Sequence, residues 1–229
     1  MTTTRPRQKR SRERVEKILL AAADELARTA DADALTTTSV SRSSGIPVAT
    51  IYRYFADRSA IISALIDQEQ DEINDLVNER IDELEVVTLD ALQDTMVRAH
   101  FDYLSASRRS MVLWFGARSS KAVLGRVERR YAYMGEWLMS GAVRSGMIRE
   151  DAPIYGGEII VWMIDRAYEY IARADRDPET VDEILGLAIR MVSRSVDEFA
   201  TERGREGISR EQFWAAFGTF QPPSGPLAK

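Results

Sequence analysis

Residues 36–58 read TTTSVSRSSGIPVATIYRYFADR and contain the clearest structural signal in this chain. They predict two short helices, over about residues 37–43 and 47–54, separated by a turn at Gly45. Thr36 is the expected N-cap of the first helix, and Gly45 supplies the left-handed backbone conformation that ends it. Two short helices around a glycine turn are typical of a helix-turn-helix, which places its second helix in the DNA major groove.

The spacing of residues in this stretch resembles the DNA-binding motif of TetR-family transcriptional regulators. That motif has a threonine, an aliphatic residue four positions on, a Gly–aliphatic pair, and a helix ending Tyr-x-Tyr/His-Phe-x-x-Lys. Its positions here are Thr36, Val40, Gly45, Ile46, Tyr52, Tyr54, Phe55 and Arg58. The resemblance implies an all-α fold, with an N-terminal three-helix DNA-binding head and a larger C-terminal helical bundle for ligand binding and dimerisation.

The resemblance and the geometry of the two helices imply which side chains contact DNA. Hydroxyls beside free backbone N–H groups suit phosphate, small residues let a helix approach base edges, and arginine can bind guanine through two hydrogen bonds. The expected DNA-binding residues are Thr37, Thr38, Arg42, Val48, Ala49, Thr50, Tyr52, Arg53, Tyr54 and Arg58. Simpler roles stay open for some of them, since the threonines can cap a helix, Arg42 can be solvated, and both tyrosines can pack between helices.

Two positions depart from the family pattern. Pro47 stands where the family often has a serine that caps the helix and contacts phosphate. A proline side chain does neither, although proline fits the first turn of a helix. Arg58 replaces the usual lysine and keeps its charge, so the resemblance still implies a phosphate contact there.

Charge is unevenly distributed along the chain. The 31 basic and 36 acidic residues give a net charge of −5, but residues 1–58 contain 11 basic and 7 acidic ones. Charges more than about 8 Å apart are largely screened at physiological salt, so a basic end can bind phosphate although the whole chain is acidic. Residues 1–10 are expected to form a disordered basic arm, which either binds an adjacent minor groove or phosphates, or stays solvated.

The hydrophobic pattern outside the helix-turn-helix predicts further helices and no strand. They are expected over about residues 11–29, 59–84, 88–106, 109–117, 120–145, 153–174 and 179–203. We therefore expect four parts: a disordered arm over 1–10, a helix-turn-helix domain over 11–58, a helical ligand-binding and dimerisation domain over 59–203, and a tail over 204–229. The tail is expected to form one or two helical turns docked by aromatic residues.

The last two long helices carry apolar residues at near-3.5 spacing. In the family, these helices pair with their copies in a homodimer, and such spacing suits that packing, although it also suits the core of a single chain. The expected dimer residues are Ile160, Ile164, Ala167, Tyr168, Ile171, Val181, Leu185, Ala188, Val192, Val196 and Phe199.

Aromatic and methionine residues gather in the middle of the chain, where the family has a ligand pocket. Such residues commonly form core, but methionine adapts to varied ligands, and polar ring atoms can orient a ligand. The expected ligand-binding residues are Met96, His100, Tyr103, Trp114, Phe115, Tyr131, Met134, Trp162 and Met163. Four acidic residues nearby either favour a cationic ligand or pair with Arg166 and Arg173; they are Asp102, Glu158, Asp165 and Glu169.

Composition excludes several classes of function. The chain has no cysteine and a single histidine, which rules out disulfides and cysteine-based metal sites and leaves few options for histidine-dependent catalysis. It has no apolar run of membrane-spanning length, no secretory signal, and no signature of a phosphate-binding loop, zinc protease or serine hydrolase. We therefore expect a cytoplasmic protein that is not an enzyme and needs no cofactor.

These observations predict a sequence-specific DNA-binding regulator. The expected form is a homodimeric repressor, bound to an inverted-repeat operator in double-stranded DNA and released by a small hydrophobic or aromatic effector. The alternative is a ligand-independent activator or DNA-organising protein.

Overall fold

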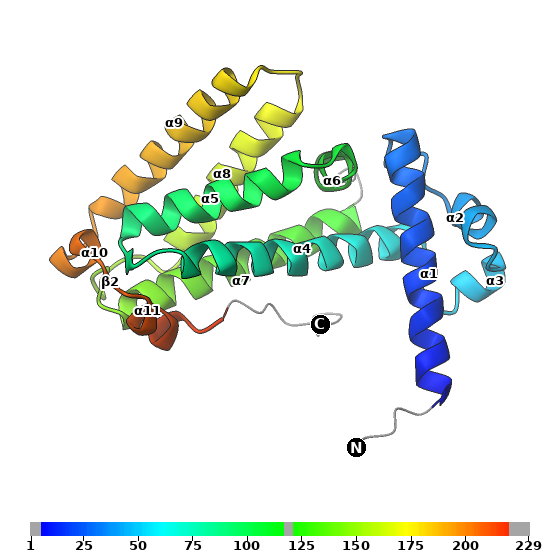
Figure 1. The fold of residues 1–229 in the computed structure, drawn as a ribbon, viewed down its shortest axis with the longest axis horizontal. Coiled ribbons are helices and arrows are strands. Elements are labelled where there is room, and N and C mark those ends of the chain that lie inside the picture. The colour runs from blue at the N-terminus through cyan, green and yellow to red at the C-terminus, as the bar shows by residue number, and fades with distance from the viewer. Residues whose placement is uncertain (1–5, 117–120, 220–229) are drawn as a thin grey trace. The chain divides into compact units, whose positions relative to one another are not determined.

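The computed structural model of the chain describes residues 6–116 and 121–219, which are almost entirely helical (Figure 1). Its helices are α1 (Pro6–Thr29), α2 (Thr37–Ser44), α3 (Val48–Ile51), α4 (Arg58–Asp82), α5 (Leu89–Ser105), α6 (Arg108–Met111), η1 (Val112–Gly116), α7 (Lys121–Arg144), α8 (Gly156–Ala172), α9 (Pro178–Asp197), α10 (Glu202–Glu206) and α11 (Arg210–Phe217). The expected all-α fold with an N-terminal helix-turn-helix is confirmed. No helix among the described residues is long and apolar enough to cross a lipid bilayer.

The chain divides into two compact units. Unit one comprises residues 1–70 and 105–126, and unit two comprises residues 71–104 and 127–229. The helix-turn-helix therefore shares unit one with the first part of α4 and with α6 and η1, whereas the expected head ended at residue 58.

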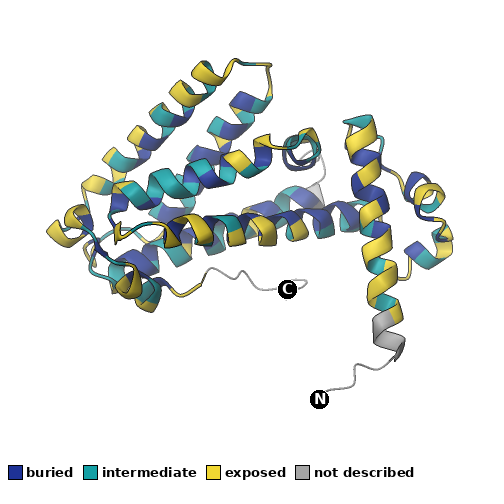
Figure 2. Ribbon diagram, in the orientation of Figure 1, coloured by how far each residue is buried: buried dark blue, intermediate teal, exposed yellow. Residues whose placement is uncertain are grey.

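Unit one is organised by the apolar side of α1. Ile18, Ala22 and Leu26 recur at helical spacing and are completely buried, and α1 packs against α2 and α6. Figure 2 shows buried and exposed residues alternating along α1. Burying each large aliphatic side chain contributes roughly 1.5–3 kcal/mol. This packing stabilises α2 and α3, because helices of this length are marginal in isolation.

Unit two contains a close approach of α7 and α8 at two glycines. A Cβ added to Gly157 would lie 2.2 Å from the carbonyl oxygen of Gly135, and one added to Gly135 would lie 2.3 Å from the backbone nitrogen of Glu158. Only glycine therefore fits at these positions. A buried cluster from the same two helices consists of Val127, Tyr131, Met134 and Val161.

Replacing Gly157 by alanine is expected to destabilise the protein by about 1–3 kcal/mol, because the added methyl forces α7 and α8 apart. The matched control is Gly186→Ala in α9, whose new Cβ meets only the flexible end of Arg190, at 3.1 Å. That control should instead gain up to roughly 1 kcal/mol from helix propensity. Urea denaturation of both variants measures the difference, and equal stabilities would contradict the close helix approach.

The segment expected to be a tail is folded. After α10, strand β2 (Ile208–Ser209) pairs antiparallel with β1 (Val86–Val87), and α11 follows directly. Phe213 and Phe217 of α11 are buried, and the indole N–H of Trp214 donates to the Asp82 carboxylate at 2.7 Å. Aromatic docking is thus present, but the segment forms two helices and a strand. Phe220 lies outside the described residues.

Three helix boundaries differ from the expected ones for local reasons. Helix α1 begins at Pro6 and not near residue 11, so residues 6–10 are helical and only the first five residues of the expected arm lie outside the described part. The expected helix over 109–117 is the short α6 continued by the π-helix η1. Helix α9 ends at Asp197, because Ala200 forms a bridge with Ile148 and the chain then turns into α10.

Candidate nucleic-acid interface

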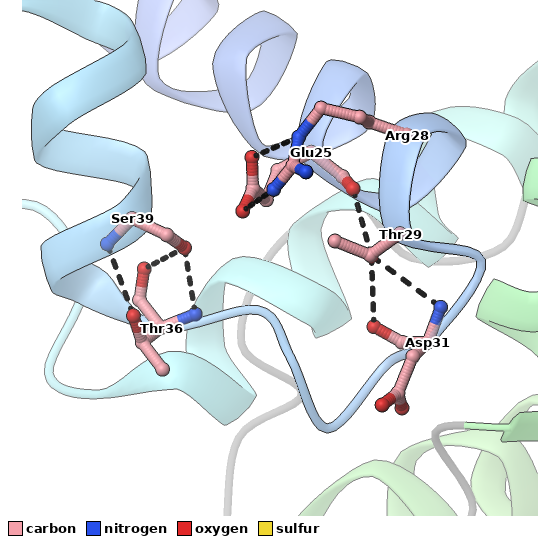
Figure 3. A network of polar contacts seen from close by, with 6 residues as sticks. All are labelled: Glu25, Arg28, Thr29, Asp31, Thr36 and Ser39. Carbon is pink, nitrogen blue, oxygen red and sulfur yellow. Dashed lines mark hydrogen bonds and ion pairs between the residues drawn. The ribbon is translucent and has the colours of Figure 1, made fainter.

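The turn between α2 and α3 is built from local hydrogen bonds. Thr36 is extended and caps α2: its hydroxyl accepts from the Ser39 N–H at 3.0 Å, and the Ser39 hydroxyl accepts from the Thr36 N–H at 3.0 Å (Figure 3). Gly45 has φ of 66° and its N–H donates to the Ser41 carbonyl at 2.9 Å. The N-cap and the glycine turn predicted from the sequence are therefore confirmed.

Helix α3 is shorter than the sequence predicted. Its α-helical part covers four residues, with Pro47 as an N-cap that makes no side-chain hydrogen bond. The backbone then tightens, since the N–H of Arg53 donates to Thr50 at 3.2 Å and that of Tyr54 donates to Ile51 at 2.9 Å. These three-residue turns replace the last turn of the expected helix, as is common at helix ends.

The side chains on α3 divide as the pattern predicted. Ile51 and Phe55 are buried in unit one. The opposite face carries Ala49 and Arg53, which are exposed, and Thr50, which is half-buried. A small residue, a hydroxyl and a guanidinium are thus presented together, with no large side chain at position 49 to keep the helix away from a base edge.

The ends of α2 and α3 meet through hydroxyl groups. The Thr37 and Tyr52 hydroxyls are 3.4 Å apart, and Tyr52 is 53% exposed. Thr38 and Arg42 are exposed on α2, and Val48 is half-buried at the start of α3. The expected DNA-binding residues of α2 and α3 therefore belong to one helix-turn-helix and have accessible polar atoms.

Tyr54 lies against α1. Hydrogen bonding to Ser11, and then to Arg14, lowers the pKa of the Tyr54 hydroxyl below its ordinary value. Tyr54 therefore packs between helices, which is one of the two roles left open for it. Its hydroxyl is hydrogen-bonded to residues of α1. No residue pattern indicates this contact, because Ser11 and Tyr54 are far apart in the sequence.

Arg58, at the start of α4, is paired with a loop residue. Its guanidinium is 2.6 Å from the Asp33 carboxylate and also donates to the Asp33 carbonyl at 3.4 Å. The two residues are 25 positions apart, so sequence reasoning had no basis for pairing them. A phosphate contact by Arg58 would have to compete with this ion pair.

The loop before α2 is positioned by α1. Glu25 is 7% exposed and forms an ion pair with Arg28 at 2.7 Å, while the Thr29 hydroxyl donates to the Glu25 carbonyl at 2.8 Å (Figure 3). The hydrogen bond from Arg28 lowers the pKa of the Glu25 carboxyl, and Arg42 contributes in the same direction. The Asp31 N–H also donates to the Thr29 hydroxyl, at 3.4 Å. This network orients the segment that leads to Thr36.

The expected ligand-binding residues are divided between the units. Trp114 and Phe115 belong to unit one, and the buried Trp114 indole donates to the Glu69 carboxylate at 3.0 Å. Unit two contains Met96, His100, Tyr103, Tyr131, Met134, Trp162 and Met163. The assignment of these nine residues to ligand binding stays a prediction.

Within unit two, several of these side chains pack against one another. Tyr131 and Trp162 meet edge to face with centroids 5.2 Å apart, and the Tyr131 hydroxyl donates to the buried Asp165 carboxylate. The His100 ring lies 5.5 Å from the Tyr168 ring. Asp165 and Glu169 both pair with Arg166, and Glu169 also pairs with Arg173, which is the ion-paired alternative left open for these acids.

A cavity of about 400 Å³ lies elsewhere in unit two. Its walls come from the start of α5, the end of α9 and α10: Thr88, Leu89, Asp90, Gln93, Ser193, Arg194, Val196, Asp197, Ala200, Gly204 and Arg205. Among these only Val196 was singled out from the sequence, and for a different role.

The expected dimer residues do not form one outward face. Five are buried within the chain: Ile164, Tyr168, Ile171, Leu185 and Val192. Six are half-buried: Ile160, Ala167, Val181, Ala188, Val196 and Phe199. The buried ones correct the expectation, because α8 and α9 pack against each other and the Tyr168 hydroxyl donates to the Val97 carbonyl at 2.8 Å. The outward apolar side chains of these helices are Ile159, Tyr170, Leu187 and Met191, each more than half exposed.

Residues 19–65 match the model of a family described as bacterial regulatory proteins, tetR family. The whole fold is similar to a TetR-family transcriptional regulator from Pectobacterium atrosepticum, with a TM-score of 0.63, 16% identity, and 87% of this chain and 99% of that chain covered. It is also similar to the regulator FadR from Bacillus subtilis in complex with stearoyl-CoA, with a TM-score of 0.58, 15% identity, and 79% and 97% covered. A TetR family transcription regulator from Marinobacter aquaeolei gives a TM-score of 0.54, 15% identity, and 80% and 97% covered. No curated protein matches the chain.

Proposed function

The chain belongs to the TetR family of DNA-binding transcriptional regulators, which are not enzymes, and from this premise we propose that it is a homodimeric repressor released from its operator by a small hydrophobic or aromatic molecule. The observation that carries the DNA-binding role is the outward face of α3, where Ala49, Thr50 and Arg53 lie opposite the buried Ile51 and Phe55.

We assign the reading of base edges to that face. Ala49 and Thr50 bring methyl groups within reach of thymine, and Arg53 is suited to guanine. Thr37 and Thr38, at the N-terminus of α2, are assigned to phosphate, because their hydroxyls and the backbone N–H groups lie at the positive end of the helix dipole. Phosphate contacts set the position of the protein, and α3 sets its sequence preference.

Dimerisation is assigned to the outer sides of α8 and α9, which pack side by side in unit two (Figure 1). Ile159 and Tyr170 on α8, with Leu187 and Met191 on α9, are more than half exposed, and exposed residues recur along α9 (Figure 2). Pairing these sides in two copies would bury them in an isologous four-helix interface. Two heads one DNA turn apart, at about 34–36 Å, then read an inverted repeat.

The effector is assigned to unit two, and its hydrophobic character rests on the aromatic and methionine residues there. The similar FadR structure holds stearoyl-CoA, which makes long-chain acyl-CoA the first compound to test. A specific observation favours the ligand-independent alternative: Tyr131, Met134 and their neighbours are packed into a buried cluster.

The deciding experiment is release from DNA. Genomic fragments retained by the purified protein are labelled, and fluorescence anisotropy follows their release by stearoyl-CoA and by a panel of hydrophobic and aromatic compounds. A compound that lowers the affinity of the protein for DNA by at least about fivefold, the lower end of typical allosteric coupling, supports the repressor. Binding that no compound changes, together with no thermal stabilisation by any of them, supports the ligand-independent alternative.

Changing Asp33 to asparagine is expected to strengthen binding to all DNA, because it frees Arg58 for a phosphate. The slope of log K against log salt concentration should steepen by up to about 0.9, the value for one full phosphate contact, because the contact made by Arg58 no longer competes with the ion pair. Arg58→Ala should flatten that slope. Anisotropy titrations at several salt concentrations measure both. If Asp33→Asn still steepens the slope in an Arg58→Ala background, the effect does not come from Arg58 and the assignment is wrong.

A further inference from the structure

Helix α9 has an outer face on which charged and apolar residues follow one another in order. At 3.6 residues per turn, five of its side chains fall within about 100° of the helix surface. They are Glu183, Leu187, Arg190, Met191 and Arg194, and all five are exposed in the single chain. Leu187 is 54% and Met191 is 52% exposed, so the face has an apolar centre with an acid on its N-terminal side and a base on its C-terminal side.

The charges of this face are not paired within the described part of the chain. Glu183, Arg190 and Arg194 form no ion pair there, whereas the exposed Asp182 of the same helix pairs with Arg98 at 2.6 Å. Charges on either side of an apolar contact can pair across an interface, where they set the choice of partner and its orientation. The outer face of α9 therefore has both an apolar centre and charges available to a partner.

The order of these residues is complementary to its own reverse. The midpoint between Glu183 and Arg194 and the midpoint between Leu187 and Met191 lie within about 1 Å of each other along the helix. A two-fold axis through this point places Glu183 of each copy opposite Arg194 of the other, and Leu187 opposite Met191. A parallel arrangement in register would instead oppose each charge to its own copy, which is repulsive. The order therefore selects antiparallel pairing of two copies.

We propose that α9 recognises α9 of a second copy in antiparallel orientation. Leu187 then packs on Met191 of the partner subunit beside the two-fold axis, and Glu183 pairs with Arg194 of the partner subunit on each side of that contact. This inference rests on the proposed homodimer, and it adds the register of the two copies and the residues that select a second copy of this chain. A protein with another order of charges would leave Glu183 or Arg194 unmatched, which disfavours mixed dimers.

The two ends of α9 are the unfavourable part of this pairing. Glu179 and Glu198 would oppose each other there, about 14 Å from the centre. Both are exposed, and charges at solvated positions interact weakly. The two contacts between Glu183 and Arg194, which lie closer to the apolar centre, therefore decide the register.

Charge reversal in the full chain tests this register. Glu183→Arg and Arg194→Glu are each expected to weaken self-association at least about tenfold, because each places two pairs of like charges across the two-fold axis. The double variant Glu183→Arg, Arg194→Glu has opposite charges at both places again, so it should regain the self-association of the wild type. Sedimentation over a range of protein concentrations measures these affinities.

Mixing the two single variants gives a second test. The Glu183→Arg variant is positive at both positions and the Arg194→Glu variant is negative at both, so their mixed dimer has opposite charges at every contact. Tagged Glu183→Arg protein should therefore retain untagged Arg194→Glu protein at least about tenfold more strongly than it retains its own untagged form.

The matched control reverses two exposed charges of α7, Glu128→Arg and Arg129→Glu, and should leave self-association unchanged. Urea denaturation establishes which variants are folded. If a single variant does not fold, the double variant decides, because it and the wild type should each associate with themselves but not with each other.

Two results would overturn the register and leave the proposed homodimer standing. One is a dimeric wild type whose reversed variants all dimerise equally well. The other is a pair of weakened single variants that do not prefer the mixed dimer. A wild type that stays monomeric at high concentration would contradict the homodimer as well as the register.

Discussion

Replacing Leu187 and Met191 together by aspartate is expected to convert the protein into a folded monomer and to weaken operator binding by at least about 100-fold. Both side chains are more than half exposed on the outer side of α9, so the change costs little within one chain. In a dimer it would bury unpaired carboxylates. Losing the second head removes the gain from binding two half-sites at once, which is commonly 10²–10⁴.

Sedimentation measures the oligomeric state, and anisotropy measures operator affinity. The matched control is Leu20→Asp, which places the same charge at a leucine that is 64% exposed in unit one; it should leave the oligomeric state unchanged. A Leu187→Asp, Met191→Asp protein that remains dimeric would show that the outer side of α8 and α9 is not the interface.

Replacing Arg53 by alanine is expected to reduce discrimination between the operator and unrelated DNA by about 1–3 kcal/mol, the contribution of one bidentate arginine–guanine contact. Arg53 is exposed where α3 ends, on the face opposite Ile51. Its loss should therefore remove information about one base pair while leaving the protein folded.

The control for Arg53 is Arg58→Ala, which removes an equal charge at the start of α4. Arg58→Ala should weaken binding to the operator and to unrelated DNA alike, because a phosphate contact carries no direct sequence information. Competition titrations with both DNAs separate the two effects. If Arg53→Ala weakens both DNAs equally, its guanidinium contacts phosphate and not a base.

The helix-turn-helix could be predicted because its signals are local. A capping threonine, a glycine with φ of 66° and apolar residues at helical spacing each act within a few residues of one another. The resemblance to a known motif then related this arrangement to DNA. The start of α3 also followed from local chemistry, although its last turn tightened in a way that no residue pattern indicated.

Contacts between distant residues could not be predicted. The pairing of Asp33 with Arg58 and the burial of Glu69 beside Arg109 depend on how helices pack. The dimer residues illustrate the same limit, because α9 has apolar residues on two sides. Periodicity selected the side with Leu185 and Val192, which is buried within the chain, whereas Leu187 and Met191 lie on the exposed side. Only packing against α8 distinguishes the two sides.

Selection of genomic fragments by the purified protein at physiological salt, followed by sequencing, tests the central claim most directly. A dimer that reads DNA with α3 predicts enrichment of one or a few inverted repeats, with half-sites one helical turn apart or a multiple of it. Substitution of Arg53 should reduce the base preference at a single position in each half-site of that repeat. Retention of fragments that share no sequence would contradict the account of a sequence-specific dimeric regulator.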